Sequence, residues 1–189
     1  MVCLVPAIAL MASLAIFSSC CAQAGSANYE RTYPPRMLAV TGEARSYFVE
    51  FRARDEVGGF GHSYVTLGAV EATGKVRETI VAGFMPKSAD DDYWGRFGMP
   101  VTGSVGVVRS DFTRRPDARF RITISKAAYY RAVSKISRLR WTWTMYELLV
   151  RNCNNFVSEI AGSVGLRTPL ITAQYPVRYV AELQALNSR

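Results

Sequence analysis

The hydrophobic pattern of this chain changes its period at Ser125, and that change limits the fold more than any other feature of the sequence. Before Ser125, short aromatic and β-branched runs alternate with breaks rich in Gly, Asp and Pro, which is typical of β-strands and turns. The expected strands are residues 47–52, 62–70, 75–84, 104–109 and 119–125. The second and third strands flank a turn-like segment and predict a hairpin.

The residues after Ser125 follow a helical period. From Ser125, a suitable N-cap, apolar residues recur every three or four positions with cations on the other face, which predicts a helix. Its apolar positions are Tyr129, Val133, Ile136 and Leu139. A second helix is expected over residues 152–164, and a third begins at Pro176 and runs toward Leu186. Strands followed by helices predict an α+β fold in a single domain.

The N-terminal residues have the composition of an export signal. The first 24 residues contain no charged side chain, and residues 7–17 are an almost unbroken apolar stretch. Small residues follow, which predicts a signal peptide over residues 1–24 with cleavage after Ala24. The apolar stretch is too short to span a bilayer. A lipoprotein anchor at Cys20 is the less favoured alternative, so the expected location is secreted or periplasmic.

Cleavage after Ala24 would leave residues 25–189, a length that suits one domain. Residues 25–45 contain two adjacent prolines and scattered polar residues, so they predict an extended N-terminal lead-in. The folded domain is expected over residues 46–189.

The chain is basic, with 23 Lys and Arg against 15 Asp and Glu and a formal net charge of +8. A basic exported protein commonly meets anions, so the charge predicts an anionic envelope surface as a partner, such as phospholipid headgroups or the carboxylates of wall peptides. The sequence has no run of Lys or Arg, no zinc-ligand spacing and no aromatic RNA-binding motif, which argues against nucleic acid.

Three adjacent aspartates, Asp90, Asp91 and Asp92, lie within residues 86–103, a segment rich in Asp, Gly and Pro that predicts a surface loop. Without an ordered pattern of ligands, such a run is typical of a solvated turn rather than of a metal site. We therefore expect neither a metal nor a cofactor.

Cys153 is the only cysteine outside the predicted signal peptide, since Cys3, Cys20 and Cys21 all lie within it. An unpaired cysteine in an exported protein indicates an intermolecular disulfide or a thiol kept for its chemistry, and a buried structural cysteine is the plain alternative. In the first turn of helix 152–164, the helical period places the thiol on the buried face. Free backbone N–H groups and the helix dipole favour a thiolate there and suit an oxyanion.

His62 is the only histidine of the chain, at the start of the expected strand 62–70 and directly after the glycine-rich segment 58–61. Imidazole is the side chain best suited to deprotonate a thiol near neutral pH, although a lone histidine is more often a surface or core residue. Because one Cys and one His remain after the predicted cleavage, each at the end of an element, Cys153 and His62 are the candidate catalytic pair.

Two segments resemble a known family. Residues 146–159, YELLVRNCNNFVSE, are similar to the segment around the nucleophile of lecithin:retinol acyltransferase-like proteins, and residues 61–68, GHSYVTLG, to the strand that carries their histidine. A histidine on an early strand and a cysteine on a late helix is the order of circularly permuted papain-like enzymes, which are related to NlpC-type wall peptidases. The resemblance implies a small antiparallel sheet with helices on one side, and thioester chemistry on amide or ester substrates.

The resemblance does not assign a residue that orients His62. The acyltransferase-like proteins carry a second histidine on the next strand, which this chain lacks. In the expected hairpin, residues 83–84 lie opposite His62 and offer no polar side chain, whereas Glu78 is polar but closer to the turn. Asn152 and Tyr146 match the family's segment and are further candidates for supporting roles, with a core position favoured for Tyr146.

The sequence thus supports two classes of function. The first is an exported cysteine hydrolase or acyltransferase, in which His62 deprotonates Cys153 and the thiolate forms a thioester with the acyl group of an amide or ester. Cell-wall peptides are the first expected substrate, because export and positive charge fit an anionic polymer outside the membrane, and acyl groups of lipids or lipoproteins are the second. The other class is a catalytically inactive envelope-binding module on the same fold.

Overall fold

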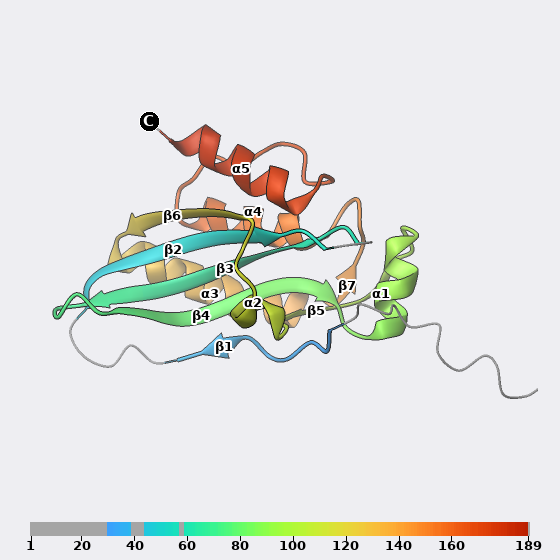
Figure 1. Cartoon of the computed structure of the whole chain (residues 1–189), viewed down its shortest axis with the longest axis horizontal. Helices are drawn as coiled ribbons and strands as arrows, with labels where there is room; N and C mark the ends of the chain where they lie inside the picture. The colour runs from blue at the N-terminus through green and yellow to red at the C-terminus, as the bar shows by residue number, and fades with distance from the viewer. Residues whose placement is uncertain (1–29, 39–43, 57–58, 189) are drawn as a thin grey trace, which may run out of the picture.

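The computed structural model describes residues 30–38, 44–56 and 59–188. They form one antiparallel sheet of seven strands with five helices. The arrangement of the helices around the sheet can be followed in Figure 1. The α+β class predicted from the sequence is therefore confirmed. The predicted signal peptide, its cleavage site and Cys20 lie outside the described residues.

The sheet has the strand order β6-β2-β3-β4-β5-β7, and β1 pairs with β4. The strands are β1 (Arg36–Met37), β2 (Ala44–Arg54), β3 (His62–Glu71), β4 (Val76–Pro86), β5 (Val101–Gly106), β6 (Ala118–Ile124) and β7 (Met145–Tyr146). The predicted hairpin is formed by β3 and β4, with Tyr64 opposite Gly83. The order brings β6 beside β2, so strands far apart in the sequence complete the sheet.

The three long helices pack against one face of the sheet and form the main hydrophobic core with it. They are α3 (Lys126–Thr142), α4 (Cys153–Ser163) and α5 (Pro176–Asn187). All three were predicted, and the first has the expected cap, since Ser125 Oγ accepts the Ala128 N–H at 3.2 Å. None of the helices in the described part is long and apolar enough to cross a membrane.

Strand β3 separates two environments, because successive side chains of a strand point to opposite faces. Val65 and Leu67 belong to the core under the long helices. Tyr64 packs instead with Val81 and Val107 in a second buried cluster on the other side. We call these two sides the helix face and the outer face of the sheet.

The prediction of a surface loop over residues 86–103 is wrong in part, because the segment contains helix α1 (Ala89–Arg96). Ser88 is the N-cap, and residues 90–92 form an acidic first turn that suits the positive end of a helix dipole. The aspartates therefore begin a helix rather than a solvated turn. Only Gly95 of this helix is buried, so the sequence carries no apolar stripe that would have revealed it.

The segment predicted as a lead-in is extended but contributes to the folded domain. β1 lies in it, and Tyr33 forms an isolated bridge with Val107. The carboxylate of Glu30 accepts the Ser110 N–H at 3.2 Å, at the start of the short helix α2 (Ser110–Thr113). The domain therefore includes residues 30–38, and β2 begins at Ala44, close to the predicted start at residue 46.

Candidate functional site

Cys153 is the first residue of α4, where the cap is formed by asparagines. Asn152 Oδ1 accepts the N–H groups of Asn154 at 2.9 Å and Asn155 at 3.1 Å, and Asn155 Oδ1 accepts the Asn152 N–H at 2.9 Å. This capping box satisfies donors that a helix start otherwise leaves unpaired. Asn152, a predicted supporting residue, therefore fixes the start of the helix that carries the cysteine.

The thiol of Cys153 interacts with Ser63, the residue that follows His62. Burial raises its pKa, while hydrogen bonding to Ser63 and to the backbone N–H groups of residues 153–154 favours the thiolate and opposes the rise. Ser63 Oγ donates to Asn154 Oδ1 at 2.8 Å. Asn154 in turn donates from Nδ2 to the carbonyl oxygens of Thr172 at 2.9 Å and Gln174 at 2.8 Å.

His62 points to the outer face of the sheet. Its ring stacks on Tyr64, with ring centroids 5.8 Å apart and an interplanar angle of 9°. The register pairs Gly83 with Tyr64 rather than with His62 as predicted, but a Cβ built at Gly83 would be 2.5 Å from His62 Nε2. Since Ser63 bonds to α4 on the helix face, strand alternation directs the preceding side chain away from α4. His62 and Cys153, the candidate catalytic pair, therefore lie on different sides of the sheet.

The imidazole of His62 is buried, and one of its two nitrogens makes no hydrogen bond to the part of the chain that the structure describes. Its Nε2 has no hydrogen-bond partner among the described residues. Burial lowers its pKa well below 6.5, and the nearby charge of Arg54 acts in the same direction. The ring is consequently neutral at pH 7, and its Nε2 is available to accept or donate a hydrogen bond.

A cavity of about 90 Å³ at one end of the sheet joins the two candidates. Its lining includes Cys153 and His62 together with Tyr146, and charged side chains such as Arg54 and Glu56. A second cavity of about 180 Å³ meets the first at Cys153 and is mostly apolar, with Phe60 among its lining residues. The cysteine therefore lies between a polar cavity and an apolar one.

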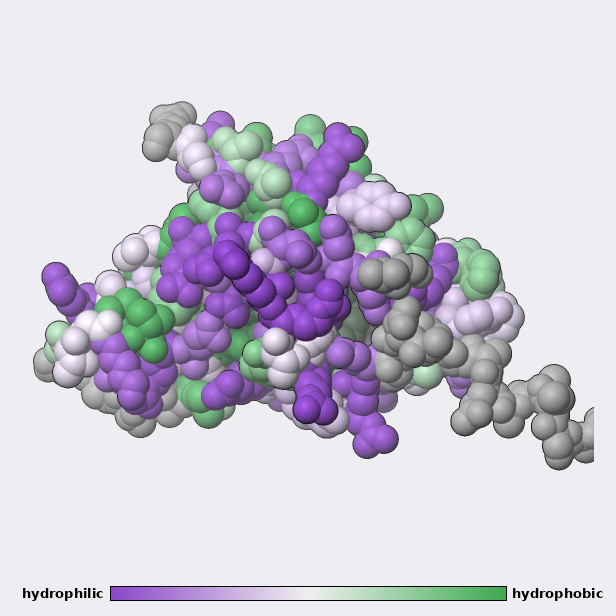
Figure 2. Space-filling model, in the orientation of Figure 1, coloured by the Kyte–Doolittle hydropathy of each residue, from purple (hydrophilic) through white to green (hydrophobic). Residues whose placement is uncertain are grey.

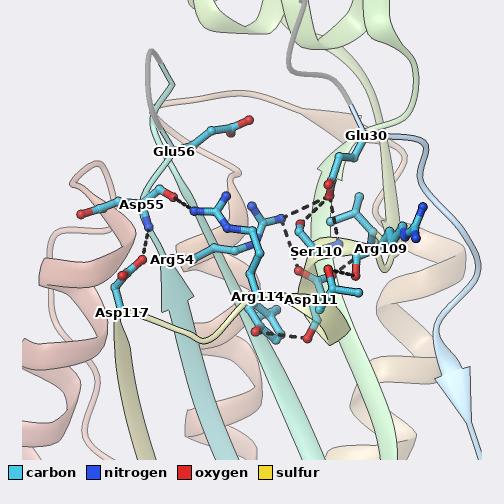
Figure 3. A network of polar contacts seen from close by, with 12 residues as sticks. Glu30, Arg54, Asp55, Glu56, Arg109, Ser110, Asp111, Arg114 and Asp117 are labelled. Atoms are coloured by element: carbon cyan, nitrogen blue, oxygen red, sulfur yellow. Dashed lines mark hydrogen bonds and ion pairs between the residues drawn. The ribbon is translucent and has the colours of Figure 1, made fainter.

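Figure 3 shows an ion-pair network around Arg54. Arg54 and Glu30 line the same cavity as His62. Arg54 from β2 reaches Asp111 of α2 at 3.4 Å and Glu30 at 4.0 Å. Asp111 also accepts the Val108 N–H at 2.9 Å, and its backbone carbonyl accepts the Tyr64 hydroxyl at 3.4 Å. Burial raises the pKa of Asp111 to about 6 despite these contacts. The sequence offered no signal for this network, because its members come from distant segments.

The remaining predicted supporting residues lie in different places. Tyr146 lines both cavities, and burial raises its pKa well above 10, with the Cys153 charge acting in the same direction. It also packs in the core, as predicted. Glu78 is opposite Gly68 on the outer face and pairs there with Arg52, so it lies along the sheet from His62 and outside both cavities.

Through Arg52, Glu78 of β4 joins a separate polar cluster carried by β2 and β6. Figure 2 shows that the outer face has a hydrophilic area. The centre of this cluster is Glu50, which is fully buried and pairs with Arg52, Arg119 and Arg121. These ion pairs lower the pKa of Glu50 although burial alone would raise it. The charged groups of this cluster therefore pair with one another on the outer face of the sheet.

Two residues of the site were missed from the sequence, Ser63 and Asn154. The alternation of β3 contained the signal for Ser63, because Val65 and Leu67 identify the odd-numbered positions as the apolar face. Asn154 could not be placed without knowing the contact between α4 and β3. Within the described residues, no three His, Cys, Asp or Glu side chains are grouped in a way that would hold a metal ion.

Comparison of the chain with protein-family models, with curated proteins and with solved structures finds no match. The function must therefore be inferred from the site itself.

Proposed function

We propose that the chain is an exported thiol hydrolase or acyltransferase of the permuted papain-like type, with Cys153 as its nucleophile and His62 as its base. One observation carries this proposal: a cysteine at a capped helix start and a buried histidine with an unpartnered nitrogen line the same cavity. An unpaired buried polar atom is costly unless a ligand, a water or a reaction uses it.

In the proposed reaction, neutral His62 takes the thiol proton across the cavity, through a water, because Cys153 of α4 lies on the helix face of the sheet and His62 points to its outer face. The thiolate attacks the carbonyl carbon of an amide or ester. The Cys153 N–H and the start of α4 stabilise the developing oxyanion, because Asn152 already binds the next two N–H groups. The protonated imidazole then gives its proton to the leaving group, and water or a second nucleophile releases the acyl group from the thioester.

Cell-wall peptides remain the first proposed substrate. The support is the net charge of +8 together with the predicted export, which suits an anionic polymer outside the membrane. Acyl groups of lipids or lipoproteins are the second, and the apolar cavity beside Cys153 favours them.

A catalytically inactive envelope-binding module is the competing function. The raised pKa of the Cys153 thiol and the outward direction of His62 favour it, since both reduce the thiolate available at neutral pH.

Mass spectrometry of the intact protein distinguishes the two. The chain and its Cys153→Ala variant are incubated with purified wall fragments and, separately, with phospholipid and lipopeptide substrates. The enzyme predicts an acyl adduct on Cys153 or a cleaved product that the variant does not form. No change in mass on any substrate would favour the binding module.

A further inference from the structure

We propose that two adjacent loop tips beside the cysteine dock on an anionic lipid surface. The first tip is the turn 148–150, closed by a bridge between Glu147 and Arg151. The second is the loop 166–175 between α4 and α5. This inference goes beyond the proposed function and does not depend on the reactivity of Cys153.

Each tip exposes two consecutive large aliphatic side chains. These are Leu149 and Val150 on the first tip, and Leu170 and Ile171 on the second, with exposed fractions between 65% and 100%. Full exposure of such side chains costs free energy in water, and clusters of them mark an interaction surface. We call these four residues and Tyr175, which is 63% exposed, the loop-tip patch.

Hydrogen bonds hold the two tips side by side. Asn152 Nδ2 donates to the Leu148 carbonyl of the first tip at 2.6 Å and to the Thr172 carbonyl of the second at 3.4 Å. Asn154 Nδ2 donates to the same Thr172 carbonyl at 2.9 Å. The two asparagines that flank Cys153 therefore fix the loops relative to each other and to the start of α4.

Part of the patch lines the apolar cavity. Leu149 and Tyr175 line that cavity together with Cys153. A surface seated on the patch would thus face the opening that leads to the thiol.

The composition of the patch favours lipid over a protein partner. Anchors at protein interfaces are enriched in Trp, Tyr and Arg and poor in Leu and Val, whereas segments that lie in a membrane interface combine apolar side chains such as Leu with Lys and Arg. Tyr175 suits the boundary between apolar and wet regions. Arg151 and Arg178 are exposed beside the patch, and the net charge is +8, so anionic headgroups complement it.

Vesicle co-sedimentation tests the proposal on residues 25–189, the form expected after signal cleavage, with the uncut chain measured beside it. We expect binding to phosphatidylglycerol-containing vesicles to be at least tenfold stronger than to pure phosphatidylcholine vesicles. The double variant Leu149→Ser, Ile171→Ser should lose tenfold or more of this binding, because each serine removes an apolar anchor.

The matched control is Val76→Ser, an exposed aliphatic in the β3–β4 hairpin at the opposite end of β3 from His62, which should change binding by less than twofold. Cys153→Ala should bind like the unchanged chain, so loss of catalysis and loss of docking are distinguishable. Unaltered thermal unfolding of the double variant excludes misfolding. The proposal would be overturned if the double variant bound anionic vesicles as strongly as the unchanged chain, or if the unchanged chain did not sediment with them. It would also be overturned if the unchanged chain were a dimer and the double variant a monomer, because the patch would then be a protein interface.

Discussion

Ser63 and His62 are neighbours in sequence, but their side chains point to opposite faces of β3. The Ser63 hydroxyl has one proton and two acceptors within its surroundings, Asn154 Oδ1 and the Cys153 sulfur. While the thiol is protonated, the proton of Ser63 is committed to Asn154. Once a thiolate forms, donation to sulfur becomes the stronger bond, because the acceptor is charged. Ser63 therefore favours ionisation of the Cys153 thiol, the proposed nucleophile.

Replacing Ser63 by Ala should raise the pKa of the Cys153 thiol further. We expect the rate of alkylation by iodoacetamide at pH 7 to fall about three- to tenfold, since one hydrogen bond to the thiolate is lost. The free energy of unfolding should fall by about 1–3 kcal/mol, because Asn154 Oδ1 loses its donor.

Thr79→Val is the matched control for Ser63→Ala. Thr79 is also buried, and its hydroxyl lies 3.1 Å from the Leu67 carbonyl oxygen and 2.7 Å from the Tyr129 hydroxyl. It should cost similar stability and leave the alkylation rate unchanged. If both variants alkylate equally fast, Ser63 has no role at the thiol.

At the scale of elements, the start of α4 organises the site. Asn152 caps the helix through Oδ1 and ties both loops to it through Nδ2. A single side chain thus positions the proposed nucleophile, the proposed oxyanion donor and the walls of the apolar cavity.

Asn152→Ala should lower the free energy of unfolding by about 2–3 kcal/mol, as a lost cap costs about 1 kcal/mol and the freed carbonyls add to it. Asn152→Ser keeps a cap acceptor but loses the Nδ2 donors, so it should recover about 1 kcal/mol. Urea unfolding measures both. Equal losses in the two variants would show that the cap contributes nothing.

Much of this architecture follows from local patterns. The hairpin of β3 and β4 and the three long helices were predictable because their apolar periods are regular. Helix α1 escaped because it buries almost no side chain, and its start signal at Ser88 has no stripe after it. The alternation of β3 places Ser63 with Val65 and Leu67 and puts His62 on the other face, but the packing of α4 against the first of these faces depends on contacts between distant segments.

At the scale of the whole molecule, the sheet divides the candidate site into two halves. The thiol belongs to the helix face, and the histidine belongs to the outer face with its ion-pair network. Only the cavity at the end of the sheet joins them in the described structure. This arrangement depends on pairings between distant segments, such as β2 with β6 and Glu30 with Ser110, which no local pattern predicts.

The two titrating groups beside Arg54 should give opposite pH dependences of stability. His62 has a folded-state pKa well below 6.5, so the unfolded chain gains a proton first and stability is lost as the pH falls below about 6.5. Asp111 has a folded-state pKa of about 6 against 3.8, so its contribution is fully present below pH 3.8 and is lost as the pH rises through 6.

Urea unfolding at pH 7 and pH 5 separates these contributions. Relative to the unchanged chain, His62→Gln should gain about 1–2 kcal/mol on acidification, and Asp111→Asn should lose a similar amount. Each variant is the control for the other, because the three proteins have all remaining carboxylates in common and these contribute equally to each pH dependence. Parallel pH profiles for the three proteins would contradict the pKa directions given for the pair.

The most direct test of the central claim is the rate of Cys153 alkylation in the folded protein, measured from pH 5 to pH 8 for the unchanged chain and for His62→Ala. If Cys153 is a nucleophile served by His62, the folded chain reacts, and the variant reacts about tenfold or more slowly near pH 7, while both react equally in urea. Reaction only after unfolding, or equal rates in the two folded proteins, would contradict it and leave Cys153 as a buried structural residue.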